Sequence, residues 1–449
     1  MSALFAVCGG AILLVWPALL NGYPLVFSDT GGLVEMGAEP YIGWDKPWVY
    51  APFLTLFHWY TTLWLPLGAQ GLLVSWILWM TQTVVGVPRP VLHLVVCAFL
   101  AAGTAAPWFT ALLMPDLFTS VTVLCLYVLA FGRERLSVLQ QVLVMALGTV
   151  AIAAHLSHLI LAAGCIAAIV AVRWPTDRWR VAWRAIVPLG AALAMLLAIN
   201  AVGHGKLAIS PYGSVFALAR LVGDGPGRAY LDRVCPDASL RLCAWQGRLS
   251  ADSDDFLWLP NGPMWADDFS PVRFAPEAAR LVPAIVAAYP LQTLQAAAAN
   301  TLRQLQMVRV GDALVADHLD IAVLPRLQPY FPPAEIARYQ AALQPRGLLR
   351  DTAEPFRWLH AVLLVAGAFG SAWIMVPCWR IDRALAGLAA ITLAALIANA
   401  FATGALSGPH DRYQARIAWL VLLPPLFYVM RAYAARAATS VGLIRTRFS

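Results

Sequence analysis

The sequence predicts an all-α polytopic membrane protein with about ten transmembrane helices. Apolar residues make up 60% of the 449 residues, and charged residues only 12%, whereas soluble proteins carry about 25% charged residues. The mean hydropathy is +0.69. The apolar residues form continuous runs and do not alternate with polar ones, which favours helices over a transmembrane barrel. This composition excludes a water-soluble enzyme and a disordered chain.

Ten apolar runs are long enough to cross a bilayer core of about 30 Å. They lie approximately at 3–20, 70–87, 90–108, 115–131, 137–154, 156–172, 184–201, 358–377, 384–403 and 417–433. The first run has no basic segment before it and no small-residue cleavage site after it. We therefore expect a retained helix at this position and not a signal peptide.

Arginines between the runs predict the orientation of the helices, because short cytoplasmic loops carry an excess of positive charge. These residues are Arg89, Arg133, Arg135, Arg173, Arg178, Arg180, Arg184, Arg380, Arg383, Arg431, Arg436, Arg445 and Arg447. All of them fall on one side if the segment 50–67 lies along the membrane surface. The alternative is that 50–67 crosses the membrane and the rule fails around Arg89. The net charge of +7 thus reflects topology, and we expect no nucleic-acid partner.

The first topology divides the chain into three parts. Residues 1–201 form an amino-terminal module of about seven spans with a long external loop at 21–69, which carries the surface helix. Residues 202–357 form a mostly helical periplasmic domain, which holds 15 of the 24 acidic residues. Residues 358–449 form a carboxy-terminal module of about three spans with a cytoplasmic tail. We expect a multi-pass protein of the bacterial inner membrane with its chemistry facing the periplasm.

Cys235 and Cys243 lie in the stretch CPDASLRLC inside the expected periplasmic domain. Their spacing allows a short disulfide loop, which fits an oxidising compartment. A metal site is the weaker interpretation, because no histidine or third cysteine is nearby. The other five cysteines lie in or beside the apolar runs, where cysteine behaves as a small hydrophobic residue.

Acidic residues at the external ends of spans are candidates for catalysis, because ionisable groups are costly near lipid. Asp29 follows the first span, and Gly31 and Gly32 after it would allow the backbone to turn tightly beside a ligand. Asp116 begins the fourth span, where its alternative role is a helix cap. We expect both aspartates to be catalytic, one of them as general base toward an acceptor hydroxyl.

Cationic residues at the same ends would bind the phosphate of an anionic donor. They are Lys46, His155, His158, Arg412 and Arg416. Spacings of three and four place each histidine or arginine pair on one helix face, and guanidinium groups suit phosphate. The alternatives are packed imidazoles and snorkelling arginines. Three further residues are expected to bind substrate: Glu35, Asp45 and Tyr413.

These residues and their order resemble the glycosyltransferase-C superfamily, above all its bacterial mannosyl-, aminoarabinosyl- and arabinosyltransferase-like members. In that family a first span is followed by an external loop with an acidic residue and then by a helix along the membrane. Asp29 and the stretch KPWVYAPFLTLFHWY at 46–60 match this pattern. A second acidic residue after the third span matches Asp116. The resemblance covers about the first 200 residues and the general layout of spans.

The resemblance implies an inverting transferase that moves a sugar from a polyprenyl-phosphate donor to a lipid, polysaccharide or protein acceptor on the periplasmic face. Asp29 would be the base or would orient the acceptor, and Asp116 would assist. Relatives often carry two adjacent acidic residues at the first site, whereas Asp29 lies between Ser28 and Thr30. The sequence therefore leaves a divalent metal open without indicating one. The alternatives are a transporter or flippase of a lipid-linked saccharide or other anionic lipid, and a scaffold whose external domain binds a partner.

Overall fold

The computed structural model describes residues 2–173, 178–235, 240–266 and 269–433, with the side chains of 178–182 left out. Within these residues every regular element is a helix, and the one β interaction is an isolated bridge between Leu25 and Leu112. The prediction of an all-helical protein is confirmed. Five of the orienting arginines lie outside the described side chains: Arg178, Arg180, Arg436, Arg445 and Arg447.

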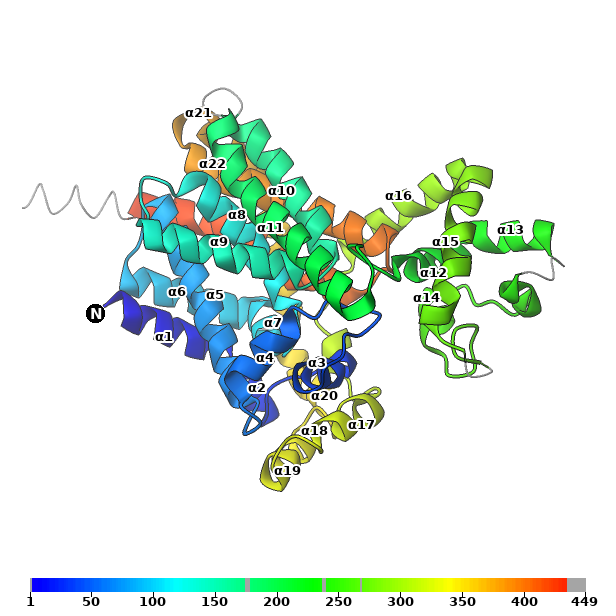
Figure 1. The fold of residues 1–449 in the computed structure, drawn as a ribbon. Helices are drawn as coiled ribbons and strands as arrows, with labels where there is room; N and C mark the ends of the chain where they lie inside the picture. Colours follow the sequence, from blue (N-terminus) through cyan, green and yellow to red (C-terminus); the bar gives the residue numbers. More distant parts are fainter. Residues whose placement is uncertain (1, 174–177, 236–239, 267–268, 434–449) are drawn as a thin grey trace, which may run out of the picture.

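Eleven helices form the amino-terminal module (Figure 1). They are α1 (Ala3–Leu14), α2 (Trp16–Asn21), α3 (Ser28–Ala38), α4 (Tyr50–His58), α5 (Trp64–Val85), α6 (Pro90–Gly103), α7 (Ala106–Ala111), α8 (Leu117–Phe131), α9 (Val138–Ala153), α10 (Ser157–Arg173) and α11 (Arg178–His204). α8 lies at the centre of this module, because almost all of its residues are buried.

The rest of the described chain is also helical. It contains α12 (Gly213–Asp224), α13 (Pro226–Val234), η1 (Arg241–Trp245), α14 (Ser253–Trp258), α15 (Pro271–Ala288), α16 (Pro290–Gln306), η3 (Asp312–Leu314), α17 (Leu319–Ala322), α18 (Leu324–Leu327), α19 (Pro333–Ala341), α20 (Leu349–Ala353) and η4 (Glu354–Phe356). The final elements are α21 (Trp358–Ile381), α22 (Arg383–Ala400), the π-helical η5 (Phe401–Ala405), α23 (Asp411–Ala418) and η6 (Trp419–Leu422).

Four described helices are long and apolar enough to cross a membrane: Trp183–His204, Trp358–Ile381, Arg383–Ala405 and Asp411–Tyr433. A fifth is added if α15 and α16, which meet at a bend of 100°, count as one broken span. Five further apolar helices have 12 to 17 residues. At 1.5 Å per residue these reach about 18–26 Å, less than a bilayer core of about 30 Å. The expected number of ten spans is therefore not confirmed.

Local breaks shorten two of the expected spans. The run 3–20 is interrupted at Val15, and Pro17 lies in the first turn of α2, where its missing N–H costs nothing. The run 90–108 is interrupted at Thr104, whose extended backbone separates α6 from α7. Hydropathy alone did not reveal either break.

The segment 50–67 does not form one helix. α4 has nine residues, which reach only about 13 Å. Trp59 and Tyr60 then adopt left-handed backbone angles, with φ of 44° and 55°. α5 begins at Trp64, earlier than the expected start at residue 70. A single helix crossing through 50–67 is thus inconsistent with the structure, while the short helix expected in this loop is present.

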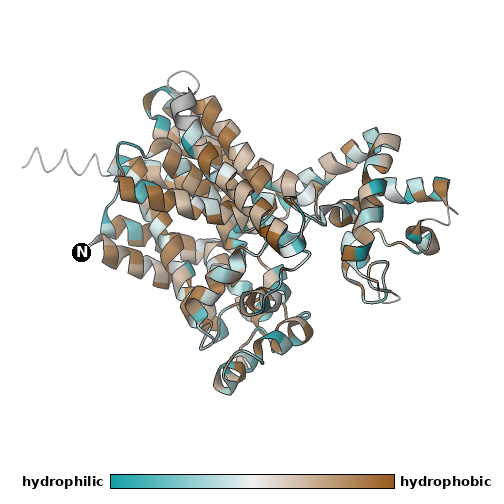
Figure 2. Ribbon diagram, in the orientation of Figure 1, coloured by the Kyte–Doolittle hydropathy of each residue, from teal (hydrophilic) through white to brown (hydrophobic). Residues whose placement is uncertain are grey.

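Residues 202–357 are divided between two hydrophobic clusters. Buried side chains of α12 to α15 pack around Phe274 and form a separate core. Buried residues between 310 and 353 instead join the main cluster of the amino- and carboxy-terminal modules. Figure 1 shows the first part projecting from the bundle, and α17 and α18 lying beside α3. We name the residues 212–288 the lobe. In the helices of the bundle, by contrast, hydrophobic residues predominate (Figure 2).

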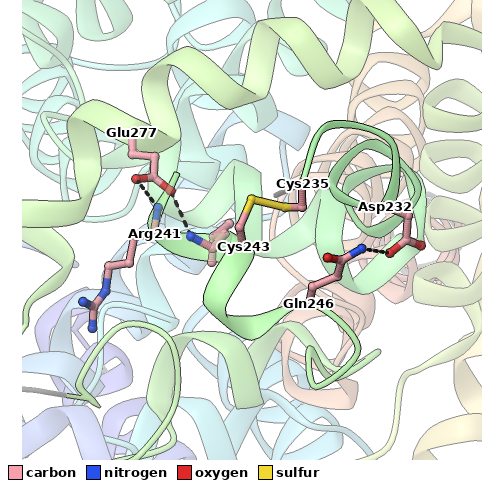
Figure 3. The surroundings of a disulfide bond; sticks show 7 residues. Asp232, Cys235, Arg241, Cys243, Gln246 and Glu277 are labelled. Atoms are coloured by element: carbon pink, nitrogen blue, oxygen red, sulfur yellow. Dashed lines mark hydrogen bonds between the residues drawn. A yellow bond between two sulfur atoms is a disulfide. The ribbon is translucent and has the colours of Figure 1, made fainter. Parts of the chain in front are cut away.

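Cys235 and Cys243 are joined by a disulfide in the lobe, with their Cα atoms 5.5 Å apart (Figure 3). Glu277 of α15 accepts hydrogen bonds from the backbone N–H groups of Arg241 and Leu242, at 3.0 and 3.2 Å. The carboxylate thereby attaches the short loop to the lobe core. The cysteines of the bundle are free thiols.

Candidate functional site

Five segments meet at one end of the bundle: the start of α3, the loop after it, the start of α8, the turn that leads into the first residues of α10, and α23. They bring together nine of the expected site residues. These are Asp29, Asp45, Lys46, Asp116, His155, His158, Arg412, Tyr413 and Arg416. We call this group the charged cluster. It has a partly exposed layer and a buried layer beneath it.

An ion-pair chain forms the exposed layer. Lys46 Nζ donates to Asp29 Oδ1 at 2.8 Å and lies 3.0 Å from Asp45 Oδ2. The Asp29 side chain is 35% exposed and that of Lys46 20%. Burial opposes ionisation of Asp29, but the positive charges of Lys46 and Arg412 outweigh it and lower the pKa of the carboxyl below 3.8. Asp29 is therefore an ionised carboxylate near neutral pH, and it remains accessible from outside.

The start of α3 is fixed by a polar contact and by close packing. The Thr30 hydroxyl accepts from the Phe27 N–H at 2.9 Å and donates to the Leu113 carbonyl at 3.1 Å. A Cβ at Gly31 would overlap the Ala322 carbonyl oxygen, whereas Gly32 has open space around it. Both glycines lie inside the helix. The expected tight turn beside a ligand is therefore wrong; Gly31 serves the packing of α3 against α17.

Arg412 lies close enough to Asp29 to lower the pKa of that carboxyl, but these two described side chains form no direct ion pair. Its guanidinium stacks on Phe27, 3.9 Å from the ring centroid, and its Nη2 donates to the Tyr413 hydroxyl at 3.2 Å. Its Nη1 is buried and has no hydrogen-bond partner among the described residues. Among the described residues, the ion pairs of the charged cluster join Lys46 to Asp29 and Asp45 and Arg416 to Asp116, and none of them includes Arg412. A buried donor without an acceptor is costly, so this group is suited to bind an anion.

Asp116 and Arg416 form the buried layer. Arg416 Nη1 lies 3.1 Å from Asp116 Oδ1, and the two side chains are 0% and 2% exposed. Arg416 Nη2 also donates to Ser157 Oγ at 3.1 Å and to Asn399 Oδ1 at 3.4 Å. Asp116 stands at the cap position of α8, but its side chain makes no capping hydrogen bond. The alternative of a simple helix cap is therefore wrong, and the carboxylate instead orients Arg416.

The two histidines differ in what they can still bind. His155 Nδ1 accepts from the Ser157 N–H at 3.2 Å, so Nε2 carries the proton of the neutral ring. Burial, with Arg416 and Arg412 nearby, lowers the pKa of His155 well below 6.5. His158 uses both ring nitrogens, with Thr119 Oγ1 and the Ala151 carbonyl each at 2.7 Å. His155 is therefore the histidine that retains a free ring position for a ligand, while His158 packs in the core.

Glu35 lies outside the charged cluster, where Arg326 Nε donates to its Oε2 at 2.9 Å. Glu35 forms an ion pair between α3 and α18, and its expected contact with substrate stays a prediction. Several contacts were not foreseen from the sequence, namely those of Phe27, Ser157, Asn399 and Asp254. Asn399 offered a signal, because a buried amide inside an apolar run requires a polar partner. Phe27 offered none.

No group of three or more His, Cys, Asp or Glu side chains in the described ranges is arranged to hold a metal ion. The carboxylates of the charged cluster are paired with Lys46 or Arg416. The cluster offers a partly exposed carboxylate, an anion-binding guanidinium and a neutral imidazole. These groups can take a proton from a hydroxyl and hold a phosphate.

Comparisons with protein-family models, curated proteins and solved structures found no match for the chain. Fold-level similarity therefore contributes nothing to the functional argument. The evidence for function comes from the geometry of the charged cluster and the apolar helices around it.

Proposed function

We propose that the protein is a glycosyltransferase of the bacterial inner membrane that uses a sugar linked to a polyprenyl phosphate. One observation carries the proposal. Arg412 holds a buried, unpartnered Nη1 close enough to Asp29 to act on its charge, at one end of helices that can cross a membrane. An anion site beside an accessible carboxylate, at the edge of lipid, fits a lipid-linked phosphate better than a soluble nucleotide.

The reaction is one inverting displacement. The donor phosphate binds Arg412, with Lys46 and neutral His155 beside it. The acceptor oxygen attacks the anomeric carbon, the bond from that carbon to the phosphate oxygen breaks, and the phosphate leaves with the electron pair. Asp29 takes the proton of the acceptor hydroxyl. When the phosphate draws Lys46 away, the pKa of Asp29 rises and the carboxylate becomes a stronger base.

The periplasmic side of the membrane is part of the proposal. The arginines that precede α6 and α9 lie at the opposite ends of those helices from the charged cluster, as the positive-inside rule expects if the cluster faces outward. The Cys235–Cys243 disulfide supports an oxidising compartment for the lobe. Membership of the glycosyltransferase-C superfamily is proposed on the same grounds, with a lipid, polysaccharide or protein as acceptor.

The test is donor consumption by purified protein in lipid nanodiscs. Polyprenyl-phosphate sugars are supplied as a panel together with periplasmic acceptor extracts, and released polyprenyl phosphate is quantified. Wild type should turn over at least one donor, and Asp29→Asn should lower turnover by at least ~100-fold while it retains donor binding. Arg412→Met should weaken donor binding itself by ~10-fold or more.

The matched control is Glu39→Gln, which neutralises a carboxylate at the carboxy-terminal end of α3. The Glu39 carboxylate accepts a hydrogen bond from the Tyr330 hydroxyl and lies outside the charged cluster. Its turnover should equal that of wild type. Full turnover in Asp29→Asn would contradict the base role. Absence of donor consumption by wild type, together with movement of a labelled lipid-linked sugar across a bilayer, would replace the transferase with a flippase.

A further inference from the structure

Four aromatic side chains gather where the lobe meets the loop that carries Lys46. Trp44 stacks on Phe216 with ring centroids 5.2 Å apart and an interplanar angle of 23°. It also lies 5.6 Å from Trp258 and 6.4 Å from Trp265. We call Trp44, Phe216, Trp258 and Trp265 the aromatic platform. None of the four rings is fully buried, and Trp258 is 46% exposed.

Two connections place the aromatic platform beside the charged cluster. Trp44 precedes Lys46 by two residues, a reach of at most about 7 Å along the chain. α14 carries Trp258 at its end and Asp254 near its start, and Asp254 Oδ2 lies 3.2 Å from His410 Nε2. His410 belongs to the same turn as Arg412. The platform is therefore connected to the anion site through the loop of Lys46 and through the contact between α14 and His410.

The turn of α14 that precedes Trp258 is acidic. α14 and its cap contribute three aspartates within four positions, and no lysine or arginine lies among them: Asp252, Asp254 and Asp255. An exposed indole at a membrane surface usually has basic neighbours that suit anionic headgroups. On α14 itself the charged residues are all acidic, and the basic groups that reach this helix, Arg220 and His410, contact Ser253 and Asp254 near its start. Carboxylates around an aromatic face instead suit a ligand with many hydroxyl groups and no negative charge.

We propose that the aromatic platform binds the saccharide part of the acceptor, a proposal that rests on the proposed transferase function. The C–H face of a sugar ring packs against Trp258, and the hydroxyls at the ring edge donate to Asp254 and Asp255. A sugar held there presents its next hydroxyl toward Asp29. The acceptor class is thus a neutral glycan or the neutral sugar end of a glycolipid.

The experiment measures saccharide binding separately from turnover. Full-length protein in nanodiscs of neutral lipid is titrated calorimetrically with manno-, gluco- and arabino-tetrasaccharides. Wild type should bind at least one of them. Trp258→Leu should weaken that binding by ~10-fold, because truncated aromatic anchors cost more than about 1 kcal/mol. Trp258→Tyr, which keeps a flat aromatic face, should restore it to within ~3-fold of wild type.

The control is Trp373→Leu on α21, which removes an indole that is 64% exposed outside the lobe. It should bind the tetrasaccharide as wild type does. Polyprenyl-phosphate binding should be unchanged in Trp258→Leu. If wild type binds none of the tetrasaccharides, or if Trp258→Leu binds them as tightly as wild type, the inference is overturned even if donor is consumed. Tetrasaccharide binding without polyprenyl-phosphate binding would overturn the transferase function, while the aromatic platform would still be a saccharide-binding site.

A membrane-facing role for the platform has a distinct signature. Hydroxyl-radical footprinting reports the solvent access of the peptide that contains Trp258. We expect the bound tetrasaccharide to protect this peptide. Protection by the bilayer, with no further change on adding the tetrasaccharide, would identify lipid as the occupant and overturn the inference.

Discussion

The buried ion pair between Asp116 and Arg416 should be energetically coupled across 300 residues of sequence. We consider Arg416→Met, Asp116→Leu and the double variant. Each replacement keeps an apolar side chain of fitting size in a site that is 0% or 2% exposed. Each single variant leaves one charge buried without its partner, whereas the double variant removes both charges.

The expected magnitudes follow from that burial. Leaving one member of a buried pair unpaired costs about 3–5 kcal/mol of unfolding free energy. Arg416→Met should lie at the upper end, because Ser157 and Asn399 also lose a donor. The double variant should be less destabilised than the sum of the singles by at least about 2 kcal/mol, since well-packed apolar residues can replace a buried pair at little cost.

The assay is equilibrium unfolding in mixed detergent micelles, and the free energies are combined in a double-mutant cycle. The matched control is Arg326 with Glu35, an ion pair at 2.9 Å whose side chains are 40% and 32% exposed. Its coupling should stay below about 1 kcal/mol. A coupling between Asp116 and Arg416 no larger than that of the control pair would refute the reasoning.

Two further predictions concern α3. Gly31→Ala should cost about 1–3 kcal/mol, because its Cβ would overlap Ala322, while Gly32→Ala in open space should stabilise by about 0.5–1 kcal/mol; equal thermal shifts would contradict this packing. The lowered pKa of Asp29 contributes stability that is present above pH 3.8 and lost as pH falls through the folded-state value. In Lys46→Met, burial should raise the pKa of Asp29, and the unfolding free energy should no longer fall with pH in this acidic range. An unchanged pH dependence would show that Lys46 does not keep the carboxylate ionised.

The sequence was sufficient to predict helices and the positions of most apolar segments. Continuous apolar runs bounded by arginine indicate helices directly, and α8 to α10 begin within two residues of the expected starts. The breaks at Val15 and Thr104 were not predictable in this way, because hydropathy averages over them. The number of spans therefore could not be derived from the same signal.

The candidate site was foreseen as a set of residues but not as an arrangement. Ionisable groups near lipid are rare, so their positions at span ends selected most of the charged cluster. Periodicity does not show which charge pairs with which. Nothing in the sequence distinguished Arg412 from Arg416. In the structure Arg412 stacks on Phe27 and its Nη1 has no partner among the described residues, whereas Arg416 forms an ion pair with Asp116. Such a difference depends on tertiary packing.

The position of the lobe between the two modules follows from the same packing. α10 and α22 pack against each other, and their contact closes the long insertion that contains the lobe. The entropic cost of closing a loop rises only with the logarithm of its length, so a large insertion is tolerated there. Gln304 at the end of α16 both donates to the His410 carbonyl at 2.7 Å and accepts from its N–H at 3.0 Å. The chain that leaves the lobe is thereby held against the turn before Arg412 by two hydrogen bonds.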